Sequence, residues 1–211
     1  EITAGDKGVL KTQGADAVNG NILTTASGAL QSTRKNILES LGDDEQRRRF
    51  SQRADVTDLQ TKHQILTHIT TQQSEYAKVT MDGSIAAANS QVSVMPTDPG
   101  VFLQARDGLM AQADLFIKTR GIHDKGAIEA YKNGLNDKLW TSRIDALLYS
   151  QPLLADALFR ANKDEIKSPE VRLLLQNKTR EVAIGVSAGL EAQKVIDDTR
   201  AEMMKPRRAP A

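Results

Sequence analysis

Apolar residues recur every three or four positions along most of the chain, which is the spacing of one face of an α-helix. No segment alternates apolar and polar residues with the period of two that marks a half-buried strand. The pattern predicts helices over roughly 14–41, 45–53, 55–91, 99–120, 124–149, 153–162 and 169–204. We therefore expect an all-α protein, a compact or elongated bundle of long and short helices.

Prolines and glycines divide the chain. The clearest break is Met95–Gly100, where two prolines and a glycine cannot continue a helix. The sequence thus predicts an N-terminal helical segment over 1–94, a Pro/Gly break over 95–100, a helical bundle over 101–204 and a basic, flexible tail over 205–211.

Two helices carry strong start signals. Asp98 is a good N-cap for a helix that begins at Pro99, because its carboxylate can accept the free N–H groups of the first turn. Ser168, Pro169 and Glu170 together supply an N-cap, a proline at the first helical position and an acid in the first turn. Both positions predict well-defined helix starts.

The helix predicted over 55–91 has a narrow apolar face and is otherwise rich in Gln, Thr and Ser. A helix with so little apolar surface is half exposed or packs along a partner chain. We take its apolar residues as a candidate self-association stripe: Val56, Leu59, Leu66, Ile69, Tyr76 and Val79. The Asp82-Gly83-Ser84 sequence is expected to kink or end this helix.

Composition narrows the classes of function. The 211 residues carry 28 basic and 27 acidic side chains, so the formal net charge is +1 at pH 7. A nucleic-acid binder concentrates positive charge, so this balance argues against that class. Cysteine is absent, which excludes disulfides, zinc fingers and thiolate nucleophiles. No apolar run approaches the roughly 18 residues that span a bilayer, so we expect no membrane span.

Histidines, glycine-rich loops and basic clusters, which often form catalytic or binding sites, show no catalytic pattern in this sequence. His63 and His68 are five residues apart, so a helix places them about 140° apart rather than on one face. Glycine-rich phosphate loops and the Gly-x-Ser-x-Gly elbow are absent. The basic run Arg47–Arg49 follows the acidic run Asp43–Glu45, which offers partners one turn away. The sequence therefore predicts no enzyme, no cofactor and no metal site.

The order of segments resembles the helical regions of internal virion proteins, the DNA-ejection proteins, of short-tailed bacteriophages and prophages. A Gly-x-x-Ala-Val opening, an acidic turn with an Arg-rich helix, and a Gln-rich helix ending in small residues follow one another. An Asp-Pro helix start and an Ala/Leu-rich hairpin, similar to those of tetratricopeptide arrays, complete the order. The matching residues are Gly14–Val18, Asp43–Phe50, Ala86–Asn89, Asp98–Pro99, Leu153–Phe159 and Asp164–Ile166. The resemblance covers about residues 7–200.

The resemblance implies a non-enzymatic structural protein of the virion, held inside the capsid and found in the bacterial envelope after ejection. Such a protein forms homo-oligomers, contacts portal or other ejection proteins, touches DNA transiently and helps to build a conduit for the genome. Alternatively, the chain is a helical adaptor or scaffold module that binds a protein partner. A groove with clustered side chains favours the adaptor, whereas flat apolar stripes favour the assembly.

Overall fold

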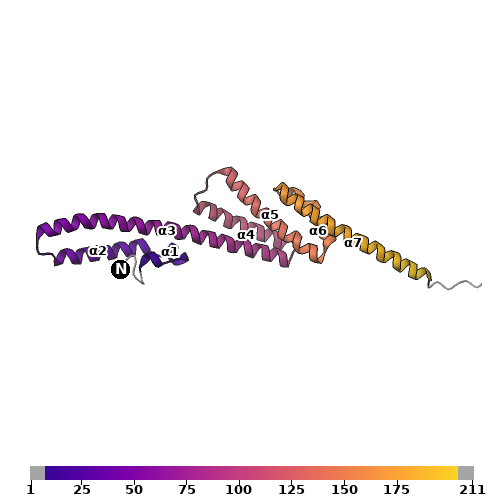
Figure 1. The fold of residues 1–211 in the computed structure, drawn as a ribbon, viewed down its shortest axis with the longest axis horizontal. Coiled ribbons are helices and arrows are strands. Elements are labelled where there is room, and N and C mark those ends of the chain that lie inside the picture. The colour runs from indigo at the N-terminus through magenta and orange to yellow at the C-terminus, as the bar shows by residue number, and fades with distance from the viewer. Residues whose placement is uncertain (1–7, 204–211) are drawn as a thin grey trace, which may run out of the picture. The chain divides into compact units, whose positions relative to one another are not determined.

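A computed structural model describes residues 8–203 of the chain, and within them it contains α-helices and short 3₁₀ turns but no strand (Figure 1). The α-helices are α1 (Gly14–Asn19), α2 (Ile22–Ser40), α3 (Asp44–Val94), α4 (Pro99–Thr119), α5 (Lys125–Ser150), α6 (Pro152–Asn162) and α7 (Pro169–Met203). The 3₁₀ turns are η1 (Val9–Lys11) and η2 (Lys163–Glu165). The predicted all-α bundle is confirmed. The predicted basic tail over 205–211 lies outside the described residues.

Two of the predicted helix limits were wrong. The helix expected over 14–41 is split into α1 and α2, because the backbone of Gly20 turns out of the helix with φ −71° and ψ 148°. A Cβ at Gly20 would lie 2.3 Å from the Asp16 carbonyl oxygen, so this turn requires glycine. The helices expected over 45–53 and 55–91 are one continuous helix, α3, and Gly83 lies inside it. One interior glycine costs only about 1 kcal/mol, which tertiary packing offsets.

Both predicted helix starts are confirmed. Asp98 Oδ1 accepts hydrogen bonds from the backbone N–H groups of Gly100 at 2.7 Å and Val101 at 3.2 Å. Ser168 Oγ accepts from the N–H of Val171 at 3.2 Å. The Ser168 hydroxyl also donates to Glu170 Oε2 at 2.7 Å, so the cap and the first-turn acid act together.

The chain divides into two compact units, each with its own core. Among the described residues, unit 1 comprises 8–82 and 118–121, and unit 2 comprises 83–117 and 122–203. The division falls inside α3, whereas the Met95–Gly100 break is a turn within unit 2.

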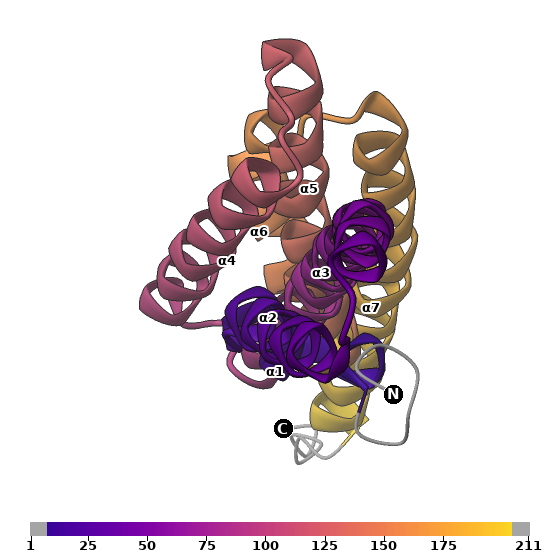
Figure 2. The same ribbon diagram turned by 90° about the vertical axis from the view of Figure 1, so that its left-hand side faces the viewer.

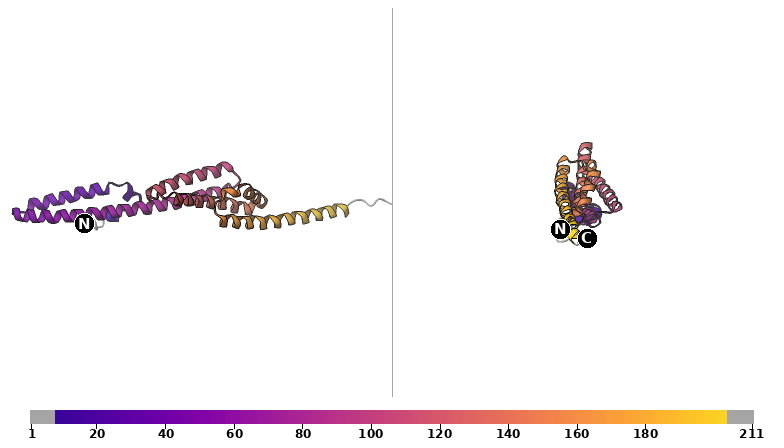
Figure 3. Two further views of the ribbon diagram at one scale, coloured as in Figure 1. Left: turned by 90° about the horizontal axis from the view of Figure 1, so that it is seen from above. Right: turned by 90° about the vertical axis from the view of Figure 1, so that its right-hand side faces the viewer.

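Unit 1 is a helical hairpin in which α1 and α2 lie along the first part of α3 (Figure 3). Its buried cluster is made of Ala17, Ile22, Ala26 and Ile65. Polar contacts join the same elements: the Gly14 N–H donates to Gln72 Oε1 at 2.9 Å, and Arg34 Nη1 lies 2.6 Å from Asp55 Oδ1. With so few large side chains inside, the hairpin depends partly on these surface bonds.

Unit 2 is a larger bundle in which α5, α6 and α7 pack on one another (Figure 2). Its core includes Phe102, Leu109 and Ile117 of α4, Leu139, Trp140, Ile144 and Leu147 of α5, Phe159 of α6, and Leu175 of α7. The rings of Phe102 and Trp140 meet with their centroids 4.4 Å apart. Aromatic contact and aliphatic packing thus anchor α4 to α5.

Two charged side chains are buried in unit 2 and organise it. Asp137 accepts from the backbone N–H groups of Lys167 at 2.8 Å and Ser168 at 2.7 Å, so a residue of α5 caps the start of α7. Arg143 donates from Nε to the Pro96 carbonyl at 2.7 Å, and its guanidinium lies 4.7 Å from the Phe102 ring centroid.

Burial lowers the pKa of the Arg143 guanidinium from its usual range, and the Asp98 carboxylate opposes that shift. The residue remains a cation because its unperturbed pKa lies so far above neutrality. A buried cation at this position therefore needs the carbonyl and the aromatic faces that surround it.

Candidate functional site

The candidate self-association stripe on α3 is mostly open to solvent. Val56, Leu59, Leu66, Tyr76 and Val79 are all exposed, Leu59 the most, at 71%. Ile69 differs, because it packs against the buried cluster of unit 1. The sequence pattern did not single out Ile65. This residue is fully buried and lies, with Ile69, on the face of α3 that packs inside unit 1.

The six stripe residues do not share one face of α3. Leu59 and Leu66 are seven residues apart and project about 20° from each other on an ideal helix, whereas Val79 lies about 140° from Leu66. Val56, Leu59, His63 and Leu66 follow the three-and-four spacing of a coiled-coil seam, and all four are exposed. We call these four residues the α3 seam.

The far half of α7 forms a second uncovered surface. Every side chain over 187–201 is exposed, including Leu190, Val195 and Ile196, and this part of α7 continues past the packed helices of unit 2 (Figure 1). Within the described part of the chain, unit 2 therefore leaves a long stretch of helix without a partner.

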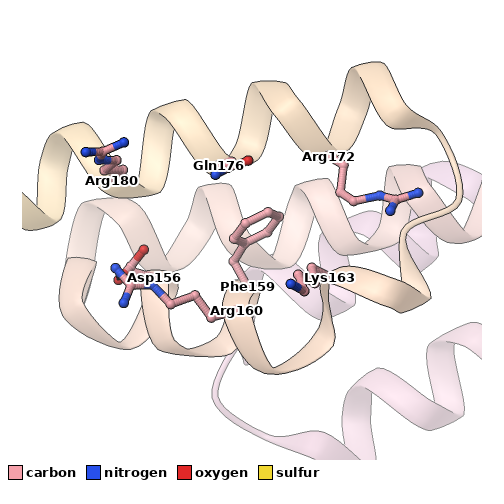
Figure 4. A pocket seen from close by; sticks show the side chains of 7 residues that line it. All are labelled: Asp156, Phe159, Arg160, Lys163, Arg172, Gln176 and Arg180. Atoms are coloured by element: carbon pink, nitrogen blue, oxygen red, sulfur yellow. Dashed lines mark ion pairs between the residues drawn. The ribbon is translucent and has the colours of Figure 1, made fainter.

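A pocket lies between α6 and α7, entirely within unit 2 (Figure 4). Its hollow has a volume of about 590 Å³ and is lined by Asp156, Phe159, Arg160, Lys163, Arg172, Gln176 and Arg180. A second hollow of about 400 Å³ continues along the same two helices and shares Asp156, Arg160 and Arg180. We call the first of these the basic pocket.

Four of the seven lining residues of the basic pocket are cations, and a single acid accompanies them. Arg160 Nη2 pairs with Asp156 Oδ2 at 2.7 Å. Arg172 donates from Nη2 to the Lys167 carbonyl at 3.4 Å, and its Nε is buried with no hydrogen-bond partner. Lys163 and Arg180 form no ion pair with any described residue.

Sequence reasoning missed this pocket, although one signal was present. Arg172, Gln176 and Arg180 recur every four residues, as do Asp156 and Arg160, so each set lies along one helix face. The sequence does not reveal that these two faces meet.

Among the other basic and histidine candidates, Arg48, Arg49 and His68 have structural partners. Arg48 and Arg49 both pair with Glu45, each at 2.7 Å, as the acidic run before them predicted. His68 Nε2 lies 2.8 Å from the Thr12 carbonyl oxygen and so joins the N-terminal segment to α3 within unit 1. His63 is exposed on the α3 seam.

Comparison with known proteins adds no assignment: no family model matches the chain, and there is no match among curated proteins or solved structures. Across residues 8–203, no helix has both the length and the apolar content needed to cross a membrane. The same residues contain no group of three or more His, Asp or Glu side chains placed to hold a metal ion. The likenesses to ejection proteins and to tetratricopeptide hairpins stay predictions from the sequence pattern.

Proposed function

We propose that the chain is a non-enzymatic assembly module that acts by pairing with further copies of itself. The α3 seam carries this proposal. Val56, Leu59 and Leu66 stand in solvent at coiled-coil spacing on a helix of 51 residues. Exposed apolar side chains in a continuous row are typical of a surface that another chain covers.

A second copy is the partner that best fits the α3 seam. A seam with spacing of three and four residues packs into the same seam of an identical helix, since each knob then meets a complementary hole. Covering two leucines on each copy removes apolar surface worth roughly 1.5–3 kcal/mol per side chain. The exposed far half of α7 offers additional surface for the same assembly.

The wider role that we propose is that of an internal virion or ejection-type protein of a phage, whose copies help to form a conduit for the genome. The segment order supports this role, and so do helices whose apolar faces find no cover in their own unit. Mass spectrometry of purified phage particles, before and after DNA release, tests it. The proposed role requires the protein in full particles and its loss from emptied ones.

Self-association is tested by light scattering after size exclusion, across a range of protein concentrations. The wild-type chain should exceed its monomer mass of 23.0 kDa. The variant Leu59→Glu/Leu66→Glu should weaken association at least about 100-fold, because each tenfold step corresponds to 1.4 kcal/mol. A wild-type monomer at every concentration would overturn the proposal.

The matched control is Gln64→Glu/Thr71→Glu. These two residues are also exposed, also seven positions apart, and on a different face of α3. The control adds the same charge to the same helix, so it should associate like the wild type. Equal loss of association in both variants would mean that added charge, and not the α3 seam, controls the assembly.

A second candidate function is that of an adaptor, and the hollows between α6 and α7 favour it. The two hollows share three residues and run along one helix pair, as a groove for a partner would. Cross-linking of the chain to a host or virion protein through residues that line these hollows would support this candidate.

A further inference from the structure

The basic pocket has more positive charge than its own surroundings neutralise. Arg160 is held by Asp156, but Lys163, Arg172 and Arg180 line the hollow without a carboxylate partner among the described residues. The other acids near them in sequence, Asp164, Glu165, Glu170 and Glu181, are not among the residues that line the pocket. Several cations that line one hollow with a single acid leave a positive potential there, which attracts an anion.

The positions of the cations favour an anion over bulk water as the occupant. Figure 4 shows Arg172 and Arg180 on α7, across from Arg160 near the end of α6 and Lys163 at the start of η2. The Nε of Arg172 is buried and donates to nothing, which leaves a desolvated, charged donor beside the hollow. A buried donor of this kind costs free energy until an acceptor reaches it.

The length of the cation row determines the class of ligand. Arg172 and Arg180 are eight residues apart on α7, or about 12 Å at 1.5 Å per residue. One phosphate ion can reach only one end of such a row. We propose that the basic pocket binds an anion built from three or more linked phosphate groups, which reaches Arg172 and Arg180 together.

The shape of the pocket distinguishes this ligand from an acidic peptide. A hollow of about 590 Å³ has the size of a small-molecule pocket, whereas a peptide helix is about 10 Å across. Guanidinium groups also match phosphate oxygens in a bidentate manner. Phe159 is only 4% exposed and offers no ring face for base stacking, so recognition depends on phosphates and not on bases.

Two phosphate sources share this chemistry, and calorimetric titration of the full chain at about 50 mM salt separates them. One arm uses sodium tripolyphosphate, and the other uses 12-nucleotide strands of dT and of dA. Binding in either arm supports the proposal: the tripolyphosphate arm indicates a free oligophosphate, and the strand arm alone indicates a nucleic acid. Both strands should then bind equally, with a salt slope of about −2 for three phosphate contacts.

The variant Arg172→Gln/Arg180→Gln should weaken that binding at least tenfold, and Arg172→Lys/Arg180→Lys, which keeps the charge but not the guanidinium, should recover only part of it. The control Lys194→Gln/Arg200→Gln removes the same charge from the exposed far half of α7 and should bind like the wild type. Thermal melts check that each variant folds. The proposal is overturned if neither phosphate probe binds, if the glutamine variant binds undiminished, or if an oligoglutamate peptide binds as tightly as the phosphate probes.

Discussion

Unit 1 and unit 2 are built from the same kind of helix but differ in what they bury. The largest fully buried side chains of the described residues are Ile65, Val92, Leu139, Ile144, Leu147, Ile166, Leu175 and Thr179, and of these only Ile65 belongs to unit 1. Unit 2 adds aromatic contacts and a buried cap on α7, whereas the buried cluster of unit 1 has two alanines and two isoleucines. A small core contributes little free energy, so we expect unit 1 to be the weaker of the two.

This difference suggests that the units have different tasks. Unit 2 has enough core to hold a pocket in place, which a binding site requires. Unit 1 displays apolar residues on a thin hairpin and gains stability when another chain covers them. Association of two copies through the α3 seam would then also stabilise unit 1.

The largest expected effects come from truncating one core isoleucine in each unit. Ile65→Ala and Ile144→Ala should each cost roughly 3 kcal/mol in their own unit, through lost burial and the remaining cavity. Trp140 is the single tryptophan and lies in unit 2, so its fluorescence reports unit 2, while circular dichroism reports all helices. As the urea concentration rises, unit 1 should unfold first. The circular dichroism signal should therefore begin to fall before the fluorescence of Trp140 changes.

The two isoleucine variants sharpen that comparison. Ile65→Ala should lower the urea midpoint of the early step only, which circular dichroism detects. Ile144→Ala should lower the urea midpoint of the step that Trp140 fluorescence detects. If both probes gave one coincident transition in the wild type, the units would unfold as a single cooperative body, and the contrast between them would be wrong.

A smaller effect is expected at the cap that α5 provides to α7. Asp137→Ala leaves the N–H groups of Lys167 and Ser168 without their acceptor and should destabilise unit 2 by about 2–3 kcal/mol. Asp145→Ala on the same helix removes only a half-exposed pair with Lys178 and should cost less than about 1 kcal/mol. Urea denaturation followed by Trp140 fluorescence measures both, and equal costs would contradict the capping role.

The smallest expected effect is a pH dependence at the start of α7. The hydrogen bond from the Ser168 hydroxyl lowers the pKa of Glu170, and a backbone hydrogen bond adds to this shift. Because the folded pKa lies below the unfolded value of about 4.3, the carboxylate stabilises the fold above that pH. This contribution disappears as the pH falls through the folded pKa.

Glu170→Gln should therefore melt below the wild type at pH 7 and match it near pH 2. Glu181→Gln, an exposed acid three turns further along α7, serves as the control for losing one charge. Thermal melts at both pH values measure the difference. A deficit that persists unchanged at pH 2 would show that the ionised carboxylate is not its source.

The sequence was a good guide wherever one local signal dominates. The starts of α4 and α7 followed from Asp98, Pro99, Ser168 and Pro169, because a cap and a proline act within a single turn. It was a poor guide at Gly20 and Gly83, since the same residue type turns the chain at one site and continues a helix at the other. Packing, and not local propensity, decides between those outcomes.

The stripe on α3 shows the same limit in another form. The sequence showed that the apolar residues recur at helical spacing. It did not show which of them face the interior of unit 1. Ile65 became the buried residue because α1 and α2 cover its side of α3, while Leu59 and Leu66 stayed exposed. Burial depends on which element lies opposite, and this is set by contacts distant in sequence.

The residue pattern alone was thus enough to predict the helical class, several helix limits and the narrow apolar face of the helix over 55–91. Only the tertiary structure revealed the basic pocket. Over residues 156–181 the chain has six basic and five acidic residues, so its local charge looks nearly balanced. Antiparallel packing of α6 on α7 brings four of these cations to one hollow together with a single acid, Asp156, because helix faces separate side chains that lie mixed in the sequence.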